Sequence, residues 1–236
     1  MNIEIYGFGK PKNSKKTCIN PNECGQDSFF IYENKDKNVI TTAVCDGVGG
    51  WLKYDIDSGY IARQMCRNMK TYSENENNPI DILEKSYNKI VENKEVDSGS
   101  TTVCLLSLQD YILKSANIGD SGYLIIRNNK KLFRSLRRGI RYPVPDQLAI
   151  ISDEFKNEKF ASDKVSDAIN ETHILKTGDI IILATDGLWD NIHDSDDILS
   201  LQLHLHDARK CCEILMKETT YGYKKDDTTI IVCKIL

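Results

Sequence analysis

Aspartates stand at the ends of several strand-like runs of this 236-residue sequence. Asp27 comes directly before the run 28–32, and Asp46 follows the run 39–45. The polar stretch ENKDKN between the two runs predicts a hairpin with both carboxylates at its open end. Similar positions downstream are held by Asp120, Asp186, Asp226 and Asp227, while Asp110 marks the turn between the runs 101–108 and 111–116. Strands that end and begin in aspartate bring these residues to one edge of an antiparallel sandwich. The sequence therefore predicts a carboxylate cluster, with no compensating cation expected nearby in the chain.

A partly buried carboxylate cluster repels itself by several kcal/mol unless a cation neutralises it. Divalent metal ions are the usual solution, and a ligand set of oxygens alone selects Mg²⁺ or Mn²⁺ over Zn²⁺. The alternative is that each aspartate only ends a strand or begins a turn, which is a common surface role. Their repetition at strand ends favours the metal site. The histidines have no HExxH spacing, so we expect no histidine metal site.

The elements that must position these residues are short strands and amphipathic helices. Runs rich in Val, Ile, Thr and Tyr predict strands over 28–32, 39–45, 101–108, 111–116, 123–127, 180–184 and 228–235. Helical periodicity covers 58–72 and 82–95, and two further helices are expected near 196–205 and 207–220. Strand clusters and helix pairs alternate in blocks, which favours an α+β fold with an antiparallel sheet core and helices outside.

Composition indicates an ordinary globular chain, with 40% apolar residues and 31 Lys+Arg against 35 Asp+Glu, a net charge of −4. We expect one domain over 1–236, a monomer, and no membrane or nucleic-acid partner. The eight cysteines form no CxxC pair, so we expect reduced thiols and a reducing compartment. The first 16 residues contain no arginine and no apolar signal core, which favours the cytoplasm.

Four ordered motifs carry a resemblance to a known family: CDGVGGW (45–51), ANIGDSG (116–122), ATDGLWDN (184–191) and DDTT (226–229). Together they resemble the protein phosphatase 2C family of metal-dependent Ser/Thr phosphatases. CGQDSFF near the start and YPVPDQL (142–148) look most like its T-cell-activation, mitochondrial-type branch. The resemblance covers about residues 20–236 and leaves a mitochondrial location open, since animal members of this branch include mitochondrial proteins.

The resemblance implies a four-layer α-β-β-α sandwich of two antiparallel sheets flanked by helix pairs. It implies hydrolysis of phosphoserine and phosphothreonine in phosphorylated protein substrates by a water that two Mg²⁺ or Mn²⁺ ions activate, with room for a third ion. Asp46 would bridge the two ions, Gly47 would offer its carbonyl, and Asp27 would act through a water. Asp186 and Asp226 would bind one ion, so that Asp46, Asp186 and Asp226 form the catalytic set. Asp120 and Asp190 would form the weaker third site.

This chain departs from the family pattern at three positions. Asn22 stands at the spacing of a phosphate-binding arginine, Gln26 replaces a common acidic residue, and Val48 replaces a frequent histidine. A lysine among Lys12, Lys15 and Lys16 would supply a point charge in place of the arginine fork. Two alternatives stay open: a pseudophosphatase that binds through a metal-loaded aspartate cluster, and a small-molecule phosphatase. Trp51 and Trp189, close to the DG motifs, are expected to have packing roles.

Overall fold

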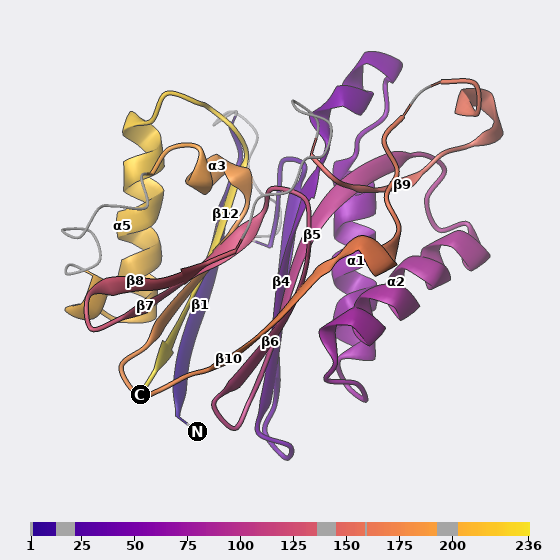
Figure 1. Ribbon diagram of the computed structural model, residues 1–236. Coiled ribbons are helices and arrows are strands. Elements are labelled where there is room, and N and C mark those ends of the chain that lie inside the picture. Colours follow the sequence, from indigo (N-terminus) through magenta and orange to yellow (C-terminus); the bar gives the residue numbers. More distant parts are fainter. Residues whose placement is uncertain (1, 13–21, 136–144, 159, 193–202) are drawn as a thin grey trace.

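The structure, a computed structural model, describes residues 2–12, 22–135, 145–158, 160–192 and 203–236. Two antiparallel sheets lie face to face, and helices cover the outer face of each sheet (Figure 1). This arrangement confirms the expected α-β-β-α sandwich. The helix expected near 196–205 lies largely outside the described residues.

The first sheet has five strands, and every neighbouring pair in it is antiparallel. Their spatial order is β1 (Ile3–Lys10), β12 (Thr228–Ile235), β11 (Ile180–Ala184), β7 (Gly122–Arg127) and β8 (Lys130–Arg134). The sequence predictions contain no strand over Ile3–Lys10. Two glycines interrupt its pattern, and at Gly7 a Cβ would lie 2.5 Å from the Phe29 ring, so the bare backbone is what permits this close packing.

The second sheet continues in the order β10 (Ile169–Ile174), β6 (Ile112–Ile118), β5 (Gly99–Gln109), β4 (Val39–Gly47), β3 (Asp27–Asn34) and β2 (Glu23–Cys24), with β9 (Leu148–Ile150) paired to β5. The predicted hairpin of β3 and β4 is present. Strand β10 was also missing from the sequence predictions. Its residues alternate between half-buried and exposed at the sheet edge, so its sequence, INETHI, carries little apolar signal.

Helices α1 (Gly59–Tyr72) and α2 (Pro79–Asn93) pack on the second sheet, while α3 (Asp186–Trp189) and α5 (Ala208–Tyr221) cover the first (Figure 1). The Asp207 carboxylate accepts a hydrogen bond from the backbone N–H of Lys210 and so caps α5. Short 3-10 helices η1 (Gly49–Tyr54), η2 (Asp153–Phe155) and η3 (Val165–Asp167) complete the connections. In the described part of the chain, no helix is both long and apolar enough to cross a bilayer.

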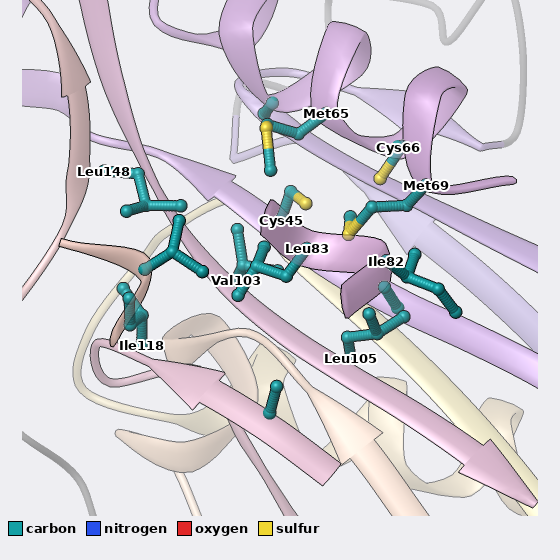
Figure 2. Packing of buried hydrophobic residues seen from close by; sticks show 14 of the residues in the cluster. Cys45, Met65, Cys66, Met69, Ile82, Leu83, Val103, Leu105, Ile118 and Leu148 are labelled. Atoms are coloured by element: carbon teal, nitrogen blue, oxygen red, sulfur yellow. The ribbon is translucent and has the colours of Figure 1, made fainter. Parts of the chain in front are cut away.

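Three hydrophobic clusters hold the four layers together. Figure 2 shows one of them, in which Met65 and Met69 of α1 and Leu83 of α2 lie against Val103 and Leu105 of β5. A second cluster fills the space between the sheets, and a third joins the first sheet to α3 and α5. Leu105 is fully buried, so Leu105→Ala would cost about 2–5 kcal/mol of stability.

Most cysteines of the described chain belong to this core. Six are free and buried: Cys45, Cys66, Cys104, Cys211, Cys212 and Cys233. They serve as small hydrophobic groups, as expected. Cys24 in β2 is disulfide-bonded, so the expectation of reduced thiols is wrong at this position. Cys18 lies outside the described residues.

Candidate metal centre

The sequence-predicted aspartates meet at one edge of the sandwich. A cavity of about 210 Å³ lies where β4, β5, the β6–β7 connection, α3 and the segment before β12 come together. Its lining includes Asp46, Gly47, Asp120, Asp186 and Asp226. The other two predicted residues are neighbours of this set: Asp27 is the partner of Asp46 in the β3–β4 ladder, and Asp190 ends α3.

Asp27 ties the two sheets together at this edge. Its side chain is fully buried, and its Oδ2 accepts hydrogen bonds of 2.8 Å from the hydroxyl groups of both Thr185 and Thr229. Thr185 follows β11 and Thr229 lies in β12, so both donors come from the first sheet while Asp27 belongs to the second. The hydroxyl pair therefore fixes the Asp27 carboxylate beside Asp46.

Burial and mutual repulsion act on both of these carboxylates. Burial, reinforced by the charge of Asp227, raises the pKa of Asp27 well above its usual value, although the threonine hydroxyls oppose this effect. For Asp46, burial and then the charges of Asp27 and Asp186 raise the pKa well above normal. The cluster thus carries unfavourable negative charge that a bound cation would neutralise.

Asp186 and Asp190 lie at the two ends of the single-turn helix α3. The backbone N–H of Asp190 donates to the carbonyl of Asp186 at 2.8 Å, which holds the pair one turn apart. Helix α3 packs closely on the start of β12: a Cβ at Gly187 would lie 2.1 Å from the carbonyl oxygen of Asp227. Glycine in the ATDG motif is therefore needed to bring Asp186 beside Asp226.

Lys224 is a cation at the centre that sequence reasoning missed. Its Nζ lies 2.6 Å from Oδ2 of Asp186, 2.7 Å from Oδ2 of Asp190 and 3.6 Å from Oδ2 of Asp226. The expectation of no nearby compensating cation is therefore wrong. The signal was present in the sequence, since Lys224 precedes Asp226 by two residues, but a lysine beside an acidic motif is usually a solvated side chain.

The backbone of Lys224 is also held in place. The Asn191 side chain donates to the Lys224 carbonyl at 2.8 Å and accepts from the Lys224 N–H at 3.0 Å. Burial lowers the pKa of the Lys224 ammonium, but hydrogen bonds to Asp186 and Asp190 outweigh this effect and raise it above its usual value. Lys224 is therefore charged among the carboxylates.

Asp227 is a second residue whose role sequence reasoning did not assign. It is buried, its Oδ1 accepts from the Lys12 N–H at 2.7 Å, and its Oδ2 accepts from the Gln26 N–H at 2.8 Å. Gly25 adopts φ +66°, and a Cβ there would lie 2.3 Å from the Asp227 carboxylate. Asp227 thus fastens two loops, around residues 12 and 26, to the edge of the cavity.

The donor set fits a hard divalent cation. Oδ1 of Asp27 and Oδ1 of Asp186 are buried without a hydrogen-bond partner among the described residues, which is costly for a carboxylate oxygen unless a cation compensates it. The donors are oxygens, the ligands preferred by Mg²⁺ and Mn²⁺. Within the described ranges, no three His, Cys, Asp or Glu side chains have the arrangement of a ready-made metal site. Because Lys224 Nζ contacts both Asp186 and Asp226, binding an ion between these two carboxylates would require the ammonium to move.

The three positions that depart from the family pattern differ in placement. Gln26 and Val48 line the cavity, and Gln26 Nε2 is buried without a partner among the described residues. Asn22 is exposed and does not belong to the cavity lining. Its carbonyl accepts from the Phe29 N–H at 3.1 Å. Lys12 does line the cavity, with its Nζ 3.4 Å from Asp226 Oδ1, whereas Lys15 and Lys16 lie outside the described residues.

Both tryptophans near the DG motifs are packing residues. Trp51 is buried, stacks on Phe160 with ring centroids 4.0 Å apart, and donates from Nε1 to Ser100 Oγ at 2.7 Å. Trp189 donates from Nε1 to the Ala184 carbonyl at 2.7 Å and carries the Arg134 guanidinium 3.5 Å above its ring. The expected packing roles are confirmed.

Comparison with known proteins places this site in a family. The family model described as Stage II sporulation protein E (SpoIIE) matches residues 36–236. The protein phosphatase PTC7 homolog fig of Drosophila grimshawi is 38% identical over 184 residues, covering 75% of this chain and 59% of that protein. The chain spans between 55% and 64% of the length of the curated relatives it matches.

Solved structures share the fold over the whole chain. The photosystem II phosphatase PBCP superposes with a TM-score of 0.81 at 22% identity, covering 100% of this chain and 99% of that one. The catalytic domain of the serine threonine protein phosphatase PstP, solved with 2 manganese ions, superposes with a TM-score of 0.66 at 14% identity, covering 99% and 98% of the two chains. With its aspartate motifs gathered at one edge of the sandwich and the family model matched over most of its length, the chain belongs to the SpoIIE family of protein phosphatase 2C-type domains.

Proposed function

We propose that the chain is the catalytic domain of a metal-dependent phosphatase that hydrolyses phosphoserine and phosphothreonine in proteins. One observation carries the proposal: aspartates from both sheets gather at a single cavity. The buried oxygens of Asp27 and Asp186, which lack partners among the described residues, support it. The names of the relatives, which are protein phosphatases, support the reaction class. We take residues 1–236 to form one domain.

The proposed cofactor is Mg²⁺ or Mn²⁺, with two ions at the centre and room for a third. The 2 manganese ions of the PstP catalytic domain support this choice. In this assignment Asp46 would be a ligand of both central ions, and Asp186 and Asp226 would bind one of them. The Gly47 carbonyl would be a further ligand. Asp120 and Asp190, at the margin, suit the third and weaker site. When bound, such ions supply an activated water and positive charge toward the phosphoryl oxygens.

The remaining side chains position these groups. Thr185 and Thr229 hold the Asp27 carboxylate in one orientation beside Asp46, so Asp27 can accept a proton or a water hydrogen at Oδ1, the atom without a partner among the described residues. Lys12 places a cation at the mouth of the cavity, where it can bind a phosphate oxygen as a point charge. Val48 has no titratable group, so position 48 does not protonate the leaving group.

Hydrolysis with controlled metal supply tests the proposal. An aryl phosphate and a phosphothreonine peptide are incubated with the protein and Mn²⁺, and then with an excess of chelator. We expect both substrates to be cleaved with Mn²⁺ and neither after chelation. Activity that survives complete chelation would contradict the metal-dependent mechanism. Cleavage of the aryl phosphate alone would indicate a small-molecule phosphatase instead.

A further inference from the structure

Two further hollows lie beside the metal cavity, along β1 and α5. The first, of about 210 Å³, shares Lys12, Lys224 and Asp226 with the cavity. The second, of about 420 Å³, shares Lys10 and Thr220 with the first and lies between β1 and α5. The shared residues place the three spaces next to one another, in a row that leads away from the carboxylates.

The walls of this row of hollows are strongly basic although the chain has a net charge of −4. The first hollow is lined by Lys10, Lys12, Lys224 and Lys225 against a single acidic residue, Asp226. The groove beyond it adds Arg209 and Lys217, with Glu213 as its acidic member. We call Lys10, Lys12, Arg209, Lys217 and Lys225 the basic track.

Much of the charge in the basic track is available to a ligand. Lys217 and Lys225 are exposed and form no ion pair within the described part of the chain. Lys10 Nζ contacts a neutral group, the Thr220 hydroxyl, at 3.3 Å. Two members already have an acidic partner: Arg209 Nε lies 3.5 Å from Glu213, and Lys12 Nζ lies 3.4 Å from Asp226.

Another hollow next to the cavity has a different character. It has a volume of about 300 Å³, shares Lys12, Gln26 and Asp227 with the cavity, and is otherwise lined by Pro11, Gly25, Leu52 and Asp57. Leu52 is exposed and Asp57 is acidic. Basic side chains are therefore concentrated in the hollows along β1 and α5, whereas the hollow at Leu52 and Asp57 presents an apolar and an acidic side chain.

We propose that the substrates are phosphoprotein segments with acidic residues on one side of the phosphorylated residue, bound along the basic track. The inference rests on the proposed phosphatase function, because the row of hollows begins beside the metal cavity. Each exposed charge pair adds up to about fivefold in affinity, and several aligned pairs also raise the rate of encounter. Tyr6, Phe8 and Met216 in the far groove suit an apolar residue beyond the acidic ones.

The test uses phosphothreonine peptides of equal length with Mn²⁺. One has glutamates before the phosphothreonine, one has them after it, one is neutral and one carries lysines. We expect one of the two acidic peptides to have a KM about tenfold below that of the neutral peptide, and the lysine peptide to have the highest KM. The difference should shrink in 0.5 M NaCl, where screening shortens the range of surface charges.

Charge reversal locates the effect. Lys225→Glu should raise the KM for the favoured acidic peptide at least fivefold and leave aryl phosphate hydrolysis within about twofold of normal. Lys35→Glu, in the turn between β3 and β4 at the far end of the hairpin, is the matched control and should change neither. Equal KM values for all peptides would overturn the inference, and so would a preference that survives Lys225→Glu combined with Lys217→Glu.

Peptide binding separates failure of this inference from failure of the proposed function. If neither aryl phosphate nor any peptide is hydrolysed, the proposed function fails. Fluorescence anisotropy with the same peptides then still reports on the basic track. Tighter binding of one acidic peptide, lost in Lys225→Glu, would support the inference, and equal binding would overturn it. Binding to phosphatidylserine vesicles that depends on Lys225, with no peptide preference, would indicate a membrane ligand and also overturn it.

Discussion

The Lys224 ammonium lies 2.6 Å from Oδ2 of Asp186, among the carboxylates that we assign to metal binding. An internal cation thus offsets part of the negative charge of the cluster, and a divalent ion has to compete with it.

We expect Lys224→Gln to bind Mn²⁺ about tenfold more tightly, because the ion no longer displaces an ammonium. The metal-free variant should be less stable by about 1 kcal/mol, a small value because the Lys224 side chain is 46% exposed. Titration calorimetry with Mn²⁺ and thermal unfolding in chelator measure the two effects. Lys225→Gln is the control. Unchanged affinity in Lys224→Gln would show that the ammonium does not compete with the ion.

Asp46→Asn removes the proposed bridging charge. We expect kcat to fall at least ~10³-fold, or about 4 kcal/mol in activation free energy. The fold should survive, because the change relieves repulsion with Asp27, its partner in the β3–β4 ladder. Steady-state kinetics with Mn²⁺ and circular dichroism check the two parts. Asp36→Asn, in the exposed β3–β4 turn, serves as the control. Near-normal turnover in Asp46→Asn would remove Asp46 from the bridging role.

The two grades of metal site can be separated by a pair of variants. Asp120→Ala should keep two tightly bound ions while kcat falls, since a site with two carboxylates binds Mg²⁺ only in the millimolar range, about 4 kcal/mol. Asp186→Ala should lose tight binding and activity together. Calorimetry with Mn²⁺, run beside turnover, compares them. Equal loss of the tight ions in both variants would contradict the division into central and accessory ligands.

Lys12 is the cation proposed to bind substrate phosphate. Lys12→Gln should raise KM for an aryl phosphate about tenfold with a smaller change in kcat, because it removes a charge-assisted contact worth about 1.5 kcal/mol. The backbone N–H that binds Asp227 is unaffected by this change. Asn22→Arg adds a cation at the spacing where the family has an arginine. We expect it to change KM little, since Asn22 lies outside the cavity lining. An unchanged KM in Lys12→Gln would remove Lys12 from phosphate binding.

His173 makes the folded state sensitive to acid. Burial lowers its pKa, and its Nε2 lies 2.8 Å from the buried Tyr123 hydroxyl. The folded state therefore binds fewer protons than the unfolded state as pH falls below the unfolded pKa of about 6.5, so stability decreases with falling pH. His204, whose pKa burial also lowers, contributes in the same direction. His173→Gln should flatten the loss of melting temperature between pH 7.5 and pH 5.5. His206→Gln is the control, and an equal slope in both variants would contradict the role of His173.

Local sequence patterns determined much of the frame. Runs rich in Val, Ile, Thr and Tyr, with the turn residues between them, predicted β3, β4, β5, β7, β11 and β12 close to their observed positions. Periodicity at Ile61, Met65 and Met69 predicted α1, and all three side chains are fully buried. The positions of the aspartates at the strand ends could be predicted for the same reason, since turns and strand ends depend on residues that are neighbours in the sequence.

Tertiary structure alone decided how the centre is completed. Strand β1 joins β12 at the edge of the first sheet, which brings Lys12 to Asp227 although 215 positions separate them. Lys224 reaches Asp186 because Asn191 and the packing at Gly187 fasten the start of β12 to α3. Asn22, at the arginine spacing of the family, lies outside the cavity for a similar reason: its carbonyl is bound by Phe29 N–H, which fixes the loop by backbone contacts. Such pairings depend on sheet register and on the packing of segments that are distant in the sequence. The sequence neighbours of one partner do not indicate which distant residue it will contact, so local patterns could not predict these pairings.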